Sequence, residues 1–285
     1  MHGIINVYKP CGMSSNFVLT LLKKQLNIKK MGHLGTLDPL ACGVLPVMIN
    51  KGTKLFNLML TKTKVYRAVF TFGKETDTLD SEGKIIKTSN NIPSVNEIET
   101  QLHKLTGNIL QLPPNFSAKS VNGERAYNLA RKGISVNLTP KNVFVESFNL
   151  IKQINKNSFL FEIKCSSGTY IRSLARDLGA LLNSCAFMSA LIRISSNEFN
   201  ILNSTVVFNL TKDNIFDKLI KFDALFKDYK KLILNNSYYK KVTNGVKIKI
   251  EHEDCKKLVV YCNNELIGLG EVLNNELIIK TNLQG

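Results

Sequence analysis

Short segments in which apolar and polar residues alternate constrain this fold more than any other feature of the sequence. Residues 63–73 and 158–165 alternate with a period of two, which predicts β-strands buried on one face. Residues 15–27 instead follow a serine cap and stack apolar side chains at helical spacing. TYIRSLARDLGALLN, which begins at Thr169, predicts a second helix opened by small hydroxyl residues. The chain therefore combines strands and helices.

Turn residues organise the segments between these elements. Residues 31–49 predict a structured loop that runs into a short buried strand, because glycines and prolines interrupt an apolar stretch. The acidic segment 75–83 predicts the turn of a hairpin, and its acid spacing does not fit a calcium loop. Residues 124–132 predict a helix that ends at Gly133.

The sequence pattern changes to short strand-like segments after about residue 226. KKLVVYC, ELIGLGEV and ELIIK alternate or run apolar, and two Asn-Asn pairs, at 263–264 and 274–275, separate them. This pattern predicts a three-stranded meander. We therefore expect a large domain over residues 1–226 and a small β module over residues 227–285.

The charge of the chain points to a polyanionic partner. Lys and Arg number 38 against 22 Asp and Glu, for a net charge of +16. A solvated lysine surface is the alternative, and lysines at the end of the first helix also suit its dipole. The candidate phosphate contacts are Lys9, Lys23, Lys24, Lys29, Lys30, Lys64, Arg67 and Lys119.

Several function classes find no support in the sequence. There is no phosphate-binding GxxxxGK[ST], no GxGxxG after a strand and no GxSxG elbow. These absences make a nucleotide cofactor and a serine hydrolase poor candidates, and because the four histidines and six cysteines lack metal-ligand spacing we expect no metal. No apolar run is long enough for a membrane span and no export signal is visible, so we expect reduced thiols in a cytoplasmic protein.

Asp38 is the residue that the charge pattern singles out. Residues 1–74 contain eleven Lys and Arg but no other acidic residue. Burial among apolar neighbours would neutralise such a carboxyl, whereas a nearby arginine would keep it ionised. Arg172 is the candidate partner, and the ionised oxygen could act as nucleophile or general base. An ordinary Asp-Pro turn is the alternative.

The run GHLGTLDPLACGVLPV resembles the catalytic signature of the tRNA pseudouridine synthases of the TruB family. KPCGMSS before it, and VYRAVFTFGKETDTLDSEGKI, QLPPNFSAKSVNGERAYNLARKG and CSSGTYIRSLARDLG after it, follow in family order. The resemblance implies an α+β fold, with a mixed, largely antiparallel sheet, flanking helices and a PUA-like RNA-binding module at the C-terminus. It also implies conversion of uridine 55 in the T-arm loop of tRNA into pseudouridine, without cofactor or metal. We expect tRNA as partner, no obligate protein partner and a monomer.

The resemblance also assigns roles to single residues. It makes Asp38 the catalytic aspartate and Arg172 its ion-pair partner. Tyr66 stacks on the flipped uracil, and Tyr170 lines the substrate pocket. The same resemblance places Leu191 beside the uracil and His33 in the RNA loop that the base has left.

Each of these roles has an ordinary structural alternative. Tyr66 could be one aromatic of a strand face, and Leu191 a core residue. Arg172 could lie on the surface of an amphipathic helix that Tyr170 helps to begin, and His33 could be structural or solvated.

The sequence also departs from the family pattern at three places. Leu34 replaces a usual Thr, Ser120 a usual Lys, and Ile192 an arginine that usually follows Leu191. The last two changes each remove a phosphate contact, for which Lys119 could compensate in one case.

The catalytic subunit of a guide-RNA particle is a related hypothesis, but the bacterial-type motifs and the minimal C-terminal module argue against it. The rival hypothesis from another class is a non-catalytic RNA-binding or RNA-folding factor in which Asp38 is structural. The sequence does not choose between attack on the sugar, attack on the base and proton removal from the sugar.

Overall fold

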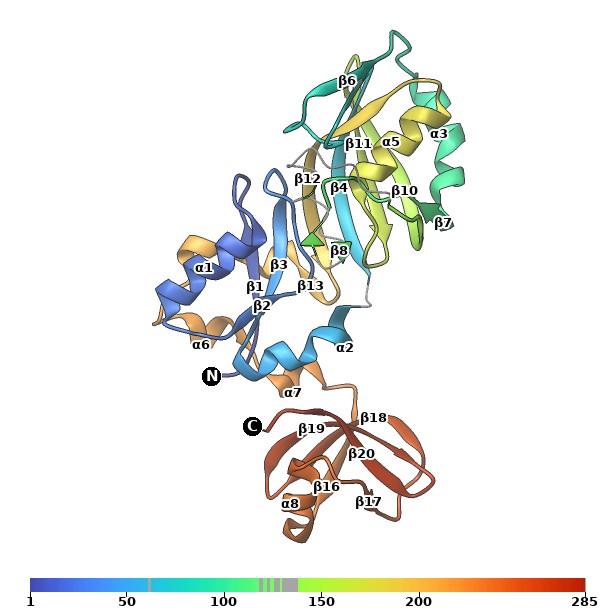
Figure 1. Cartoon of the computed structure of the whole chain (residues 1–285). Helices are drawn as coiled ribbons and strands as arrows, with labels where there is room; N and C mark the ends of the chain where they lie inside the picture. Colours follow the sequence, from blue (N-terminus) through green and yellow to red (C-terminus); the bar gives the residue numbers. More distant parts are fainter. Residues whose placement is uncertain (61–62, 118–119, 122–123, 126–128, 130–137, 285) are drawn as a thin grey trace.

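The computed structural model describes residues 1–284 apart from 61–62, 118–119, 122–123, 126–128 and 130–137. A mixed sheet forms the large upper part of the molecule, and a separate curled sheet lies below it (Figure 1). The upper sheet runs in the order β14 (Thr205–Val206), β1 (Gly3–Lys9), β3 (Cys42–Ile49), β12 (Ala186–Ser196), β4 (Lys64–Phe72), β11 (Ser158–Cys165), β10 (Lys141–Asn155) and β7 (Gly107–Gln111). Three short strands join it at the side, namely β2 (Met31–His33), β13 (Phe199–Asn200) and β15 (Leu219–Ile220).

Most neighbouring strands of this sheet are antiparallel, and the β1–β14 and β3–β12 pairs are parallel. The α+β class with a mixed, largely antiparallel sheet is therefore confirmed. Two small hairpins complete the β structure of the upper part: β5 (Lys74–Thr76) with β6 (Ile85–Thr88), and β8 (Ser120–Val121) with β9 (Glu124–Arg125).

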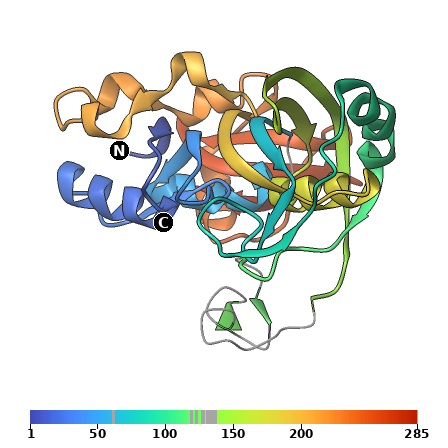
Figure 2. The same cartoon turned by 90° about the horizontal axis from the view of Figure 1, so that it is seen from above.

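Helices flank the sheet (Figure 2). They are α1 (Ser15–Leu26), α2 (Phe56–Leu60), α3 (Val95–Leu102), α5 (Ile171–Leu181), α6 (Ile215–Lys218), α7 (Phe222–Leu225) and α8 (Tyr239–Thr243). Short 3-10 turns occupy Asn50–Leu55, His103–Leu105, Ile201–Asn203, Val207–Asn209 and Asn236–Tyr238. α5 packs on β12 and β4, and α3 packs on β10, so both cover one face of the sheet.

Local sequence explains the ends of α1. Ser14 caps the helix by accepting a hydrogen bond from the backbone N–H of Phe17, as the serine pair predicted. Asn27 ends it in the left-handed conformation. α5 begins differently from the prediction, because Tyr170 stands at its N-cap and makes no side-chain cap bond.

The alternating segment 63–73 forms β4 as predicted. Tyr66, Ala68, Phe70 and Phe72 all lie buried on one face. Phe70 and Phe72 pack against the aromatic rings of β11, which gives the large core its centre.

The helix predicted over residues 124–132 is wrong at its start. Glu124 and Arg125 form strand β9 and pair with β8. The strand pairing of these two residues overrides the local helical signal, and most of the remaining segment lies outside the described residues.

The two halves of the upper sheet meet along a short seam between β3 and β12. Only two residue pairs join the described strands there, Ile192 with Cys42 and Arg193 with Gly43. A side chain at Gly43 would lie 2.3 Å from the carbonyl oxygen of Arg193, so this close approach requires glycine. The loop that contains Asp38 enters β3 at this seam.

The C-terminal sheet contains the predicted meander and two further strands. Its order is β16 (Lys230–Leu234), β18 (Cys255–Cys262), β19 (Glu265–Leu273), β20 (Glu276–Asn282) and β17 (Ile248–Lys249). All four asparagines of the two Asn-Asn turns have positive φ, between 51° and 60°. That geometry is typical of tight hairpin turns, so the turn prediction is confirmed.

An apolar cluster joins the C-terminal sheet to the upper part of the molecule. Val259 and Leu269 of the C-terminal sheet belong to one buried cluster with Leu55, Met59 and Met48 of the upper part. The small module is therefore packed against its neighbour rather than tethered to it.

Candidate active site

A cavity of about 830 Å³ opens at the seam of the upper sheet. Most of its lining comes from the loop 35–38, the start of β4, residues 166–172 and the middle of β12, and Pro113 and Lys141 complete it. A cavity of this volume can enclose a small molecule or a single nucleotide base. The lining includes six of the predicted site residues, namely Asp38, Lys64, Tyr66, Tyr170, Arg172 and Leu191.

Asp38 and Arg172 form a two-pronged ion pair in the wall of the cavity. Arg172 Nη2 donates to Asp38 Oδ1 at 3.1 Å, and Nε lies 3.0 Å from Asp38 Oδ2. Such bidentate pairs are strong and fix the plane of the carboxylate. The side chain of Arg172 is only 7% exposed, which excludes the surface-arginine alternative.

Asp80 holds Arg172 from the other side. Its Oδ2 lies 3.3 Å from Arg172 Nη1, and its side chain is buried. Asp80 Oδ1 accepts from the hydroxyl of Thr78 and the backbone N–H of Glu82, so the hairpin turn itself positions this carboxylate. The acidic segment predicted as a plain turn thus supplies a site residue that the sequence reasoning missed.

The environment makes Asp38 a stronger base than an exposed aspartate. Burial raises the pKa of its carboxyl above the ordinary value, the Arg172 guanidinium opposes this rise, and the nearby Asp80 adds to it. The side chain keeps 31% exposure toward the cavity. The Asp38 side chain is therefore both held in place and accessible to a substrate.

The loop around Asp38 is clamped by buried polar groups of the N-terminal segment. The hydroxyl of Ser15 donates to the carbonyl oxygen of Leu37 at 3.0 Å and accepts from its N–H at 2.8 Å. The N–H of Gly12 donates to the carbonyl oxygen of Pro39 at 2.8 Å. Asp38 thus stands between two anchored neighbours, which limits its motion.

Lys9 belongs to the same clamp, and its prediction as a phosphate contact is wrong. Its ammonium group donates to the carbonyl oxygens of Pro10 and Met13 at 2.9 and 2.6 Å, and the residue is fully buried. A cation enclosed by its own backbone cannot reach RNA. The charge pattern could not reveal this burial.

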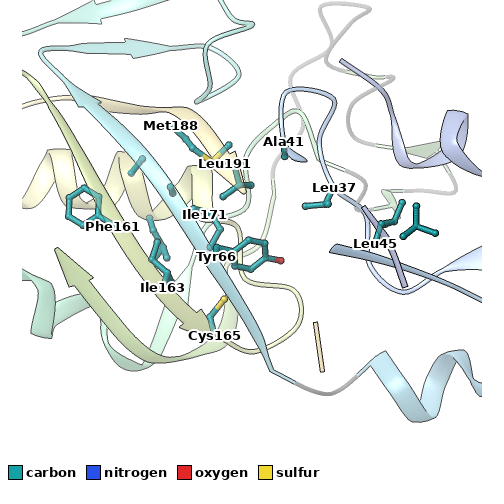
Figure 3. Close-up of a cluster of buried hydrophobic side chains, with 14 of the residues drawn as sticks. Leu37, Ala41, Leu45, Tyr66, Phe161, Ile163, Cys165, Ile171, Met188 and Leu191 are labelled. Carbon is teal, nitrogen blue, oxygen red and sulfur yellow. The ribbon is translucent and has the colours of Figure 1, made fainter. Parts of the chain in front are cut away.

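Tyr66 and Leu191 face the cavity from neighbouring strands. Tyr66 projects from β4 toward the loop of Leu37 and Ala41, and Leu191 and Met188 lie beside it on β12 (Figure 3). Burial raises the pKa of the Tyr66 hydroxyl, which keeps it protonated at neutral pH. A flat ring could stack on Tyr66 on one side and contact Leu191 on the other.

Gln111 fixes the position of Tyr170. Its side-chain amide donates to the carbonyl oxygen of Tyr170 at 3.1 Å and accepts from the N–H of the same residue at 2.8 Å. Gln111 is buried at the end of β7. The sequence reasoning missed this glutamine because nothing in its local pattern indicates such a contact.

Two buried cations line the cavity at the start of β4 and on β12. Lys64 Nζ donates to the hydroxyl of Ser167 at 2.9 Å. Arg193 Nε and Nη2 donate to the carbonyl oxygens of Val44 at 2.6 Å and Gly35 at 3.1 Å. Burial and the neighbouring Arg193 lower the pKa of Lys64 to about 8. Lys64, predicted as an RNA contact, therefore lies inside the cavity rather than on the outer surface.

The other predicted residues lie apart from this cavity. His33 belongs to β2 and does not line it, and burial lowers its pKa. Lys24, Lys29 and Lys30 are exposed and Lys23 half-buried at the end of α1 and just beyond it. Arg67 is exposed on the opposite face of β4 and pairs with Glu162 at 2.9 Å. Lys119 lies outside the described residues.

No group of three or more potential metal ligands occurs among the residues that the structure describes. No helix in the described part of the chain has both the length and the apolar composition that crossing a bilayer requires.

The chain matches a known protein family. Residues 23–171 match the model of the TruB family pseudouridylate synthase, N-terminal domain. The chain is 42% identical over 276 residues to the tRNA pseudouridine synthase B of Clostridium novyi, with 95% of each chain covered. It is 36% identical over 284 residues to the protein of the same name from Alkaliphilus oremlandii, with 97% of this chain and 95% of the relative covered.

Solved structures show the same architecture at lower identity. The chain matches an H/ACA RNP bound to a substrate RNA containing 2′-deoxyuridine with a TM-score of 0.70 and 21% identity, over 99% of this chain and 85% of that one. It matches the archaeal box H/ACA sRNP Nop10–Cbf5 complex with a TM-score of 0.70 and 20% identity, over 99% and 86% of the two chains. This likeness concerns the fold alone.

Proposed function

The chain belongs to the TruB family of pseudouridylate synthases, and from this premise we propose that it isomerises uridine 55 in the T-arm loop of tRNA, with Asp38 as the catalytic carboxylate. Its relatives named tRNA pseudouridine synthase B cover nearly its whole length, so it is a tRNA pseudouridine synthase. The position in the tRNA and the roles of single residues are the proposal.

The observation that carries the proposal is the Asp38 carboxylate, gripped by Arg172 and open to the cavity. Isomerisation must break the bond from ribose C1′ to N1 of uracil, turn the base and form a bond from C1′ to C5. A fixed carboxylate can attack the sugar, attack the base or remove a sugar proton. The product is an isomer of the substrate, so the reaction consumes no cofactor.

The detached base has to stay in the cavity while it turns. Extruding a nucleotide from its stack costs a few kcal/mol, and stacking on an aromatic side chain recovers part of this. Tyr66 supplies such a face, and Leu191 and Tyr170 close the space around it. We propose that these three side chains hold the uracil during its rotation.

The exposed lysines at the end of α1 are the proposed contacts to tRNA phosphates. Lys24, Lys29 and Lys30 lie on the surface in a segment rich in basic residues. We propose that residues 1–226 form the catalytic domain and that residues 227–285 act as a PUA-like RNA-binding module. We also propose that the protein works as a monomer in the cytoplasm, and that His33 enters the loop that the uridine leaves.

The experiment that tests the proposal compares two aspartate variants. Asp38→Asn keeps the shape of the side chain but removes the ionised oxygen, so it should make no pseudouridine while tRNA binding stays unchanged. Asp177→Asn is the matched control, because Asp177 is also ion-paired to an arginine of α5 and is 29% exposed. This variant should keep full activity.

The assay incubates each protein with an unmodified tRNA transcript and maps pseudouridine along the RNA. Pseudouridine at position 55 with wild type and none with Asp38→Asn supports the proposal. Wild-type yield from Asp38→Asn in a single turnover would refute the catalytic role and favour the RNA-folding alternative. Pseudouridine at another position only would refute the site specificity.

A further inference from the structure

Lys64 and Arg193 form a cationic pair at the inner end of the cavity. They flank Tyr66 in the sheet, since Lys64 is two residues before it on β4 and Arg193 is its register partner on β12. A Cβ placed on Gly35 would lie 3.8 Å from Lys64 Nζ and 3.6 Å from Arg193 Nη1. Both cationic groups therefore converge on the same small space.

Among the residues that the structure describes, no carboxylate pairs with Lys64 or Arg193. Arg193 Nη1 is buried beside the Tyr66 hydroxyl without a hydrogen bond of normal geometry. Asp38 and Asp80 are both occupied by Arg172. A buried charge without a partner is costly for the fold, so two adjacent ones indicate a site that an anion completes.

The depth of the pair identifies which part of an extruded nucleotide it meets. Lys64 is 5% exposed and Arg193 is fully buried, whereas Asp38 keeps 31% exposure. A nucleotide enters such a cavity with its base first, because its phosphates stay connected to the RNA outside. Groups that lie deeper than the catalytic carboxylate therefore face the base and not the phosphates.

We propose that Lys64 and Arg193 are catalytic residues. During isomerisation the uracil carries negative charge on a carbonyl oxygen, and these two cations stabilise that charge; this inference rests on the proposed function. When the C1′–N1 bond breaks, its electron pair leaves with the uracil, and N1 and the carbonyl oxygens share the charge. C5 then uses an electron pair to bond to C1′, which releases the Asp38 carboxylate if that had attacked the sugar; the proton on C5 passes to Asp38 or to water, and N1 takes up a proton from solvent. Attack of the carboxylate on the base would also place negative charge on a carbonyl oxygen, so every route needs this site.

Lys64→Met is the deciding variant. Methionine has a similar length and no charge, and replacing an unpaired buried cation by an apolar side chain does not endanger folding. Removal of one donor to a developing oxyanion slows catalysis about 100-fold in other enzymes. We expect a similar fall in the single-turnover rate, with unchanged affinity for tRNA. Lys152→Met, an exposed lysine of β10 outside the cavity, is the control and should behave as wild type.

A substrate with 5-fluorouridine at the target position separates charge stabilisation from a structural role. Fluorine withdraws electrons and stabilises the uracil anion by itself, so the variant should lose about tenfold less rate on this substrate than on uridine. Fluorine also blocks the last proton loss, so the readout is disappearance of 5-fluorouridine from a nucleoside digest.

The outcomes are distinct. An unchanged rate in Lys64→Met overturns the inference, and so does a weaker tRNA affinity with a normal rate at saturation, which would indicate a phosphate contact. Equal losses on uridine and 5-fluorouridine overturn it in favour of a structural role. If wild type itself makes no pseudouridine, the proposed function fails instead.

Discussion

Lys64→Met should make the protein more stable at neutral pH while it makes the enzyme slower. Moving the pKa of a lysine from the ordinary 10.5 to about 8 corresponds to about 3 kcal/mol of lost stability when the group is charged. Methionine removes this penalty but also the hydrogen bond to Ser167, which contributes about 1 kcal/mol. We therefore expect the free energy of unfolding to rise by about 2 kcal/mol at pH 7.

The pH dependence gives this prediction its sign. Because the pKa of Lys64 is lower in the folded chain, the unfolded chain binds more protons between pH 8 and 10.5. Wild type therefore gains stability as pH rises through that window, and the variant does not. The advantage of Lys64→Met should fall below about 0.5 kcal/mol at pH 9.5. Other titrating groups are the same in both proteins and cancel in the difference.

Urea unfolding followed by far-UV circular dichroism measures this difference, since the chain contains no tryptophan for a fluorescence assay. Lys152→Met should change stability by less than about 0.5 kcal/mol at both pH values. A variant that is less stable than wild type at pH 7, or whose advantage is the same at pH 7 and pH 9.5, would refute the reasoning.

Four further predictions follow from the site. Asp80→Asn removes a negative charge that raises the pKa of Asp38, so the acid limb of the single-turnover rate should move to lower pH; an unmoved limb would show that Asp80 does not act on Asp38. Ser15→Ala loses both hydrogen bonds to Leu37 and should lower the free energy of unfolding by about 1–3 kcal/mol in urea melts, together with the rate. Tyr66→Leu should cut the single-turnover rate much more than tRNA affinity, and equal rates would contradict its stacking role. In a filter-binding titration, the affinity for tRNA should fall steeply between low and moderate salt, because basic side chains displace counterions from the RNA phosphates. An affinity that does not change with salt would count against phosphate contacts.

The strands of this fold could be predicted because their signals are local. Alternation of side chains in β4 and β11 follows directly from burial on one face, and the Asn-Asn pairs adopt the positive φ that tight turns require. Strand β9 at Glu124 and Arg125 could not be predicted in this way. Pairing of Glu124 and Arg125 with a neighbouring strand overrode their helical tendency.

The Asp38–Arg172 pair could be predicted because a lone carboxylate in a basic segment needs a cation, and the structure confirms the contact. Asp80 could not, since a turn that displays its acids to solvent and a turn that buries one have the same sequence pattern. Lys9 shows the same limit for cations. Sequence reveals that a lysine is present but not whether water, RNA or its own backbone surrounds it.

The apolar cluster that includes Leu55, Met59, Val259 and Leu269 has a consequence for protein engineering. Ending the chain at residue 226 would expose the apolar surface of the larger part that the C-terminal sheet now covers. The shortened protein would aggregate rather than remain a folded, active enzyme. A minimal version would first need Leu55 and Met59 replaced by hydrophilic side chains.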